Sequence, residues 1–250
     1  MHNPSCKKTA MTGDGNGFIT DTYWLGLGDH RRPLPPAFAV AFDASSYTPM
    51  IFTLLEIKRP PEIQRAVINR QAEFLAGRLA ARQAMTCLGT SDAELEIGAL
   101  RQPVWPSGMT GSITHTNSIG AAIAVPSSMV RGVGIDIECI IDNETADAIR
   151  DTVLTDEELS IFAAEDCSID SNIFLTIVFS AKESFFKATS FHAGQYFDFH
   201  ALRLIRLDTA SGRLMFMVAQ TISQELHVGR IFDACFRVID ERTVLTSFVW

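Results

Sequence analysis

The run GVGIDIE, residues 132–138, constrains the fold of this chain more than any other segment. Side chains alternate between the two faces of a strand, so its three β-branched residues share one face. Asp136 and Glu138 share the other face, with Cα atoms about 6.6 Å apart. Two carboxylates on one face repel each other unless a cation or a hydrogen-bond donor lies between them. The run therefore predicts a strand with one apolar face and one face suited to a hard cation such as Mg²⁺.

Gly134 lies on the same face as the two acids and has no side chain. We therefore expect Gly134 to keep that face open for a ligand. The alternative is an edge strand whose acids simply face solvent, which is the usual position of Asp and Glu. The run does not match the GxGxxG pattern of dinucleotide-binding loops, and no helix start follows it directly.

Segment 171–190 is rich in Phe, Ile, Leu and Val and is predicted to form a long, mostly buried helix. Glu183 and Lys187 are four residues apart and share one face of this helix. The ordinary explanation of such a pair is a surface ion pair that contributes about 0.3–0.5 kcal/mol. In a buried helix, a carboxylate and an ammonium both need partners. Our hypothesis is that Glu183 is a third metal ligand beside a phosphate-binding Lys187.

Arginines on the helix predicted over residues 62–88 form another candidate group. Arg78 and Arg82 are four residues apart on one face, and like charges disfavour each other unless they meet an anion. Phosphate suits this position because its oxygens match the guanidinium fork. Arg70 lies on the same helix. A solvated basic face explains the same spacing equally well.

The segment GSITHTNSIGAAIAV, residues 111–125, predicts two strands joined by a turn at Asn117-Ser118. Together with GVGIDIE, these strands are expected to form a three-stranded meander. His115 lies in the first strand, and a lone strand histidine is more often structural than catalytic. Arg101, shortly before PVWP, is a similarly weak candidate on its own.

Composition limits what else the chain could be. It has 250 residues with 47% hydrophobic side chains, enough for a core of its own. Its formal net charge of −8 excludes a dominant basic surface and so argues against nucleic-acid binding. We see no apolar run of transmembrane length and no apolar stretch typical of a signal peptide. Five scattered cysteines indicate reduced thiols, and we expect a cytoplasmic protein.

The order of the predicted elements favours an α+β fold of two similar halves. We expect each half to pack one long helix on a mostly antiparallel sheet, with an approximate twofold between the halves and a ligand cleft where they meet. The expected divisions are a loosely ordered segment at 1–20, a first half at 21–127 and a second half at 128–250. The other expected elements are a strand at 37–43, a capping box formed by Thr155 and Glu158, and C-terminal strands with turns at 209–212 and 240–242.

Four segments together resemble the Sfp-type 4′-phosphopantetheinyl transferases. GVGIDIE and FSAKESFFKA match the two signature motifs of that family in order and spacing. RQAEFLAGRLAAR and QPVWPSGMTGSITHT are similar to the EntD-like subgroup of siderophore enzymes. The resemblance covers roughly residues 60–190. One departure is Phe179, where the family commonly has Trp; because an aromatic ring is kept, we expect altered packing and not lost activity.

The resemblance also implies roles for the candidate residues. Asp136, Glu138 and Glu183 correspond to the Mg²⁺ ligands of the family, and Asp136, Glu183 and Lys187 form the implied catalytic group. Assignment among the arginines of the first helix is open, because arginines vary there. The implied coenzyme A-binding residues are Arg70, Arg78, Arg101, His115 and Lys187.

The implied reaction moves phosphopantetheine from coenzyme A to a serine of an apo carrier protein and releases adenosine 3′,5′-bisphosphate. Mg²⁺ is the implied cofactor, and the implied partner of this monomer is an acyl, peptidyl or aryl carrier domain, with the siderophore type favoured by the EntD-like motifs. Two alternatives stay open. One is another Mg²⁺-dependent enzyme of phosphate esters, which leaves the AGR and WPxGxxGSITH segments unexplained. The other is a non-catalytic module that binds coenzyme A or a carrier protein.

Overall fold

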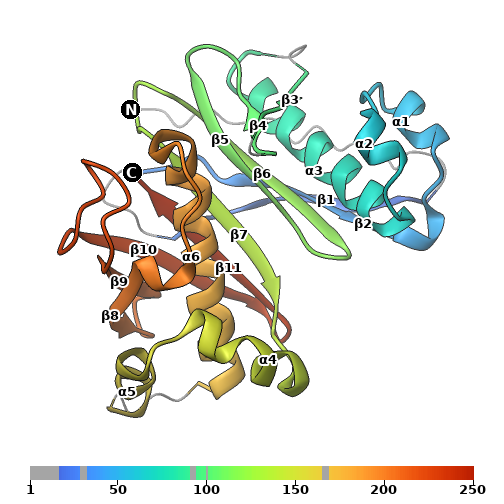
Figure 1. Ribbon diagram of the computed structural model, residues 1–250. Helices are drawn as coiled ribbons and strands as arrows, with labels where there is room; N and C mark the ends of the chain where they lie inside the picture. The colour runs from blue at the N-terminus through green and yellow to red at the C-terminus, as the bar shows by residue number, and fades with distance from the viewer. Residues whose placement is uncertain (1–16, 29–32, 91–93, 100, 165–168) are drawn as a thin grey trace.

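Two large antiparallel sheets, each covered by one long helix, form most of the described part of the chain, and two short strands form a small third sheet (Figure 1). Helix α3 (Ile68–Thr86) packs on the four-stranded sheet, and helix α6 (Ser171–Ala193) packs on the five-stranded sheet. This arrangement confirms the predicted α+β fold of two halves. The computed structural model describes residues 17–28, 33–90, 94–99, 101–164 and 169–250.

The sheet of the first half has the strand order β1-β2-β6-β5. The paired strands predicted over 111–125 and the strand predicted at 37–43 are both present in it. Of the segment expected to be loosely ordered, residues 1–16 lie outside the described residues, whereas Phe18 and Ile19 are buried where β1 begins. The strands of this sheet are β1 (Ile19–Leu25), β2 (Ala37–Phe42), β5 (Met109–His115) and β6 (Ile119–Pro126).

The helix predicted over residues 62–88 is divided into α2 (Pro61–Gln64) and α3, so that prediction was wrong in its first turn. The backbone is extended at Val67, between the two helices. The side-chain amide of Gln71 donates a 2.7 Å hydrogen bond to the Ala66 carbonyl. This bond satisfies a carbonyl that a continuous helix would have used, and so it stabilises the break. The other short elements of this half are η1 (Ala44–Ser46), α1 (Met50–Leu54), β3 (Glu96–Ile97) and β4 (Pro103–Val104).

The sheet of the second half has the strand order β7-β11-β10-β9-β8. The capping box is confirmed, because Glu158 accepts a hydrogen bond from the Thr155 backbone N–H at 2.9 Å and donates its own N–H to the Thr155 hydroxyl. The predicted C-terminal strands are also present. The elements of this half besides α6 are β7 (Val133–Cys139), α4 (Asn143–Val153), α5 (Asp156–Ala164), η2 (Phe199–Ala201), β8 (Leu202–Asp208), β9 (Arg213–Val218), β10 (Ile231–Asp240) and β11 (Thr243–Val249).

Strand β7 is not the third strand of a meander, so that prediction was wrong. Both edges of β6 are already paired, with β2 on one side and β5 on the other. The chain after Pro126 therefore passes to the second sheet, where β7 pairs with β11. Strand β7 still lies against β5, but side chains and not a backbone ladder join these two edges.

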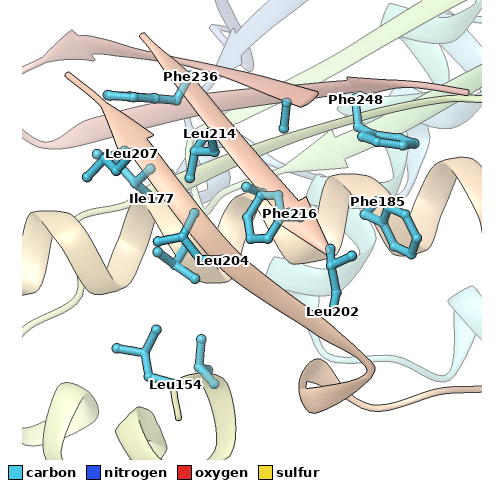
Figure 2. Close-up of a cluster of buried hydrophobic side chains, with 14 of the residues drawn as sticks. Leu154, Ile177, Phe185, Leu202, Leu204, Leu207, Leu214, Phe216, Phe236 and Phe248 are labelled. Carbon is cyan, nitrogen blue, oxygen red and sulfur yellow. The ribbon is translucent and has the colours of Figure 1, made fainter. Parts of the chain in front are cut away.

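Most of the buried apolar side chains lie in three layers of the molecule. One cluster lies between α3 and the first sheet, and another lies between the two sheets and contains Ile135 and Ile137 of β7. The third lies between α6 and the second sheet; Figure 2 shows Phe185, Phe216 and Phe248 within it. Burying each such side chain contributes about 1.5–3 kcal/mol. The apolar face predicted for GVGIDIE is therefore the face that joins the halves.

Glycines let α6 lie directly on β7. A Cβ at Gly132 or Gly134 would lie well under 3.0 Å from the backbone oxygen of Ala188 or Ser184. The expectation that Gly134 keeps its face open for a ligand was therefore wrong, since the α6 backbone fills that space. This close approach brings α6 to the face of β7 that carries Asp136.

The thiols differ from one another. Cys139 and Cys235 form no disulfide, as expected, but Cys87 is disulfide-bonded, so the prediction of five reduced thiols was wrong at Cys87. Cys6 and Cys167 lie outside the described residues. Within the described part of the chain, no helix combines the length and the apolar character needed to cross a membrane.

Candidate active site

Asp136 lies at the centre of the candidate site. Asp136 is 2% exposed, which excludes the alternative that it is an acid of an edge strand facing solvent. Its Oδ1 accepts hydrogen bonds from Lys187 Nζ at 2.5 Å and from the Thr114 hydroxyl at 3.0 Å. Its Oδ2 is buried and has no hydrogen-bond partner among the described residues. A buried carboxylate oxygen without a partner is costly, so Oδ2 is suited to an incoming cation or donor.

Glu138 and Glu183 lie close enough to Asp136 for its charge to shift their pKa values. Burial, together with the charges of Asp136 and Glu183, raises the pKa of Glu138 to about 8, and Lys187 opposes this rise. Burial also raises the pKa of Glu183, with Asp136 acting in the same direction and Lys187 against it. Three acids from β7 and α6 therefore share one electrostatic environment, as the sequence predicted. Lys187 forms its ion pair with Asp136, so the surface pair of Glu183 and Lys187 is not what the structure shows.

The donor set fits a hard divalent cation. Carboxylate oxygens are the ligands that Mg²⁺ prefers, and the unpartnered Oδ2 of Asp136 is a free ligand atom. Within the described residues, no three His, Cys, Asp or Glu side chains yet gather tightly enough to hold a metal. The ammonium of Lys187 is the cation that neutralises Asp136 in this arrangement. A metal bound at Oδ2 would therefore need further ligand atoms to move toward it.

His115 and Arg70 extend the site into the first half. The Arg70 guanidinium contacts the His115 ring, and Glu73 lies 3.3 Å from Arg70 Nη1 and 3.5 Å from His115 Nδ1. Burial, Arg70 and Lys187 lower the pKa of His115 to about 4, and Asp136 opposes them. His115 is therefore neutral at pH 7 and acts there as a hydrogen-bonding group. The structure thus brings Arg70 and His115 into contact with Lys187 nearby, and their binding of one ligand stays a prediction.

Arg78 and Arg82 line a different cavity of about 510 Å³. Arg78 lies over the Phe74 ring with 4.8 Å to its centroid, and its buried Nη1 has no hydrogen-bond partner among the described residues. Burial lowers the pKa of Arg78 to about 10. Arg82 instead donates to the backbone carbonyl of Leu55 at 2.7 Å. The structure thus separates an arginine with an unused donor from one that supports the end of α1.

Arg101 is exposed and has a left-handed backbone with φ 63. It lies in the turn between β3 and β4 and does not line the cavity that Gln102 and Lys187 share. The segment after it does approach the site, because Trp105 and Lys187 line one cavity of about 290 Å³ between the halves. The structure therefore brings the PVWP segment, but not the Arg101 side chain, next to Lys187.

Glu73 and Thr114 were not predicted from the sequence. Glu73 is three residues after Arg70 on α3, a spacing that places both on one helix face. Thr114 alternates with Ser112 along β5, and that alternation was the available signal for two hydroxyls on one strand face. Phe179, the aromatic departure from the family pattern, packs against Phe199 with ring centroids 5.4 Å apart.

A buried carboxylate with two acids, a lysine, an arginine and a histidine around it is suited to an enzyme that acts on phosphate groups. The comparisons with known proteins agree. Residues 59–125 match the 4′-phosphopantetheinyl transferase N-terminal domain, and residues 132–235 match the 4′-phosphopantetheinyl transferase superfamily.

Individual relatives give the same result. Enterobactin synthase component D of Salmonella typhi is 40% identical over 172 residues, which cover 69% of this chain and 68% of the relative. The same component of Escherichia coli K12 is 39% identical over 150 residues, covering 60% and 68%. The 4′-phosphopantetheinyl transferase PptT of Mycobacterium tuberculosis is 40% identical over 91 residues, covering 36% and 40%. The chain belongs to the 4′-phosphopantetheinyl transferase superfamily, and its activity is 4′-phosphopantetheinyl transfer.

Proposed function

We propose that this transferase moves 4′-phosphopantetheine from coenzyme A to a serine of a peptidyl or aryl carrier domain of a siderophore-type peptide synthetase. The observation that carries the proposal is the unpartnered Oδ2 of Asp136, surrounded by Glu138, Glu183 and Lys187. The similarity to enterobactin synthase component D supports the siderophore type of carrier.

Asp136, Glu138 and Glu183 would hold Mg²⁺. When bound, the ion supplies positive charge at the pyrophosphate of coenzyme A, where negative charge develops during transfer. Lys187 would then leave Asp136 and bind the phosphate of the leaving group, since its ammonium already lies at the carboxylate that would hold the metal. The ion pair between Lys187 and Asp136 would thus be lost, and Mg²⁺ and Lys187 would each contact coenzyme A instead.

Glu183 would accept the proton of the attacking serine. The serine oxygen forms a bond to the pantetheine-side phosphorus, and the bond from that phosphorus to the bridging oxygen breaks. Adenosine 3′,5′-bisphosphate leaves with the bridging oxygen, and the serine proton passes to Glu183. A raised pKa makes Glu183 a stronger base than an exposed glutamate, although a smaller fraction of it is ionised at neutral pH.

Residues of the first half would bind the nucleotide part of coenzyme A. Arg70 and His115 lie beside the catalytic group, and Arg78 has a buried donor without a partner. Arg101 would also bind the nucleotide part. The support for this role is that the residues directly after Arg101 line the cavity beside Lys187. Arg82 is not included, because its guanidinium is bonded to backbone carbonyls.

This distribution of residues supports the proposed division of the chain. The candidate coenzyme A residues Arg70, Arg78 and His115 lie in the half at 21–127, and the three acids lie in the half at 128–250. We further propose that the enzyme acts as a cytoplasmic monomer without nucleic acid. Size-exclusion chromatography with light scattering tests the monomer, and a dimer would overturn it.

A panel of carriers tests the proposed function. Apo peptidyl and aryl carrier domains of siderophore synthetases and an apo fatty-acid carrier are incubated separately with the enzyme, coenzyme A and Mg²⁺. We expect kcat/KM at least tenfold higher for the siderophore carriers. A preference for the fatty-acid carrier would overturn the proposed partner while leaving the transferase activity intact.

A further inference from the structure

Two hydroxyl side chains of β5 satisfy backbone groups of β7. The Ser112 hydroxyl accepts a 3.0 Å hydrogen bond from the Ile135 N–H, and the Thr114 hydroxyl accepts a 3.0 Å hydrogen bond from the Ile137 N–H. Ser112 and Thr114 are 3% and 2% exposed, so water does not compete for these bonds. The two side chains replace the backbone pairing that the neighbouring strand edges lack.

Only one of these hydroxyls also reaches the candidate site. Thr114 donates to Asp136 Oδ1 at 3.0 Å, whereas the hydroxyl of Ser112 has the Ile135 carbonyl as its acceptor at 3.4 Å. A hydroxyl has a single hydrogen to donate. The Ile137 N–H and the Asp136 carboxylate therefore hold the Thr114 hydroxyl in one orientation.

The contact has a consequence for Asp136. Oδ1 is held by Thr114 and Lys187, while Oδ2 stays without a partner in the described part of the chain. If Lys187 leaves to bind phosphate, Thr114 is the remaining donor on Oδ1. Because Thr114 precedes His115, it also links the half that carries the histidine to the half that carries the carboxylate.

We propose that Thr114 is a positioning residue that holds the Asp136 carboxylate across the junction of the two halves, so that Oδ2 faces the cation. This inference rests on the proposed Mg²⁺-binding role of Asp136. Groups that orient a metal ligand typically change metal affinity or activity by about 10–100-fold when they are removed. We expect an effect in this range from the loss of the Thr114 hydroxyl.

The test compares Thr114→Val with Ser112→Ala and Thr114→Ser. Thr114→Val and Ser112→Ala each leave one buried N–H of β7 without its acceptor, so both lower the melting temperature. Thr114→Ser keeps both hydrogen bonds. Two quantities are measured for each variant: the rise in melting temperature on addition of Mg²⁺ alone, and the Mg²⁺ concentration that gives half-maximal transfer to an apo carrier.

We expect Thr114→Val to need at least tenfold more Mg²⁺ for half-maximal transfer and to lose most of the Mg²⁺-induced rise in melting temperature. Ser112→Ala and Thr114→Ser should keep wild-type values of both quantities. Equal Mg²⁺ responses of Thr114→Val and Ser112→Ala would overturn the inference and leave Thr114 as a link between strands. A wild-type protein that transfers phosphopantetheine without any response to Mg²⁺ would overturn the proposed metal site as well.

Discussion

Gly134 of β7 lies directly beneath the backbone oxygen of Ser184 on α6, at a separation that leaves no room for a Cβ. Gly134→Ala should therefore push α6 away from β7 and move Glu183 and Lys187 away from Asp136. Overpacking of this kind costs about 1–3 kcal/mol and can cost more where the obstacle is backbone. We expect a loss of stability at the upper end of this range and at least a hundredfold fall in kcat, measured by urea unfolding and by transfer assays.

Gly229→Ala is the matched control for that variant. A Cβ at Gly229 meets no atom within 4 Å, and only its φ of 85 disfavours alanine. This substitution should cost about 1–2 kcal/mol and leave kcat unchanged. A Gly134→Ala protein with wild-type kcat would show that the close packing of α6 on β7 does not position the site.

Removal of the metal should make stability more sensitive to pH. The pKa of Glu138 is about 8 in the folded protein against an ordinary 4.5, so the folded state binds this proton more tightly than the unfolded state. The associated stability is present below about pH 4.5 and is lost as pH rises through about 8. In EDTA, the melting temperature of the wild type should fall between about pH 6 and pH 9 more than that of Glu138→Gln.

Addition of Mg²⁺ should reverse that loss, and more strongly at the higher pH, because the ion binds ionised carboxylates. Glu138→Gln should show little pH dependence of its Mg²⁺ response over the same range. The same pH profile in Glu138→Gln and wild type would contradict the assignment of the titration to Glu138.

The buried ion pair between Lys182 and Glu158 should stabilise the folded protein. Lys182 Nζ lies 2.8 Å from Glu158 Oε1, the two side chains are 2% and 0% exposed, and Lys182 also donates to the Val153 carbonyl. Loss of one partner leaves an uncompensated buried charge, so Lys182→Met should cost about 3–5 kcal/mol in urea unfolding. The double variant Lys182→Met/Glu158→Gln should recover part of that loss. A double variant less stable than Lys182→Met would contradict this explanation.

Substitutions of Arg78 and Arg82 on α3 should affect different quantities, the KM for coenzyme A in one case and stability in the other. Arg78→Gln should raise the KM for coenzyme A about tenfold with a smaller effect on kcat, because its free donor faces a cavity. Arg82→Gln should lower stability by about 1 kcal/mol and leave that KM unchanged, since its donor supports the Leu55 carbonyl. A pure kcat defect in Arg78→Gln would exclude the phosphate-binding role.

Much of the candidate site could be predicted because its residues lie in segments with strong local patterns. Alternation in β7 placed Asp136 and Glu138 on one face, and helical spacing placed Glu183 and Lys187 together on another element. The structure joins these faces, as expected. The resemblance to a family was also correct, since both halves match the 4′-phosphopantetheinyl transferases.

The remaining features depend on contacts between segments far apart in the sequence. No local pattern showed that Gly134 admits the α6 backbone, because its neighbour Ser184 is fifty residues further along the chain. The pairing of β7 with β11 could not be predicted either, because the two strands are far apart in the sequence, and β7 was therefore assigned to the wrong sheet. The Thr114 contact with Asp136 likewise appears only once the halves are placed together.

The most direct test of the site is intact-protein mass spectrometry of an apo peptidyl carrier domain after incubation with the enzyme, coenzyme A and Mg²⁺. Parallel reactions contain EDTA or replace the enzyme with Asp136→Asn or Glu183→Gln. We predict that the carrier gains one phosphopantetheine with the wild-type enzyme and Mg²⁺ and gains none in the other three reactions over the same period. Transfer at the wild-type rate by either variant would show that the reaction does not use these carboxylates.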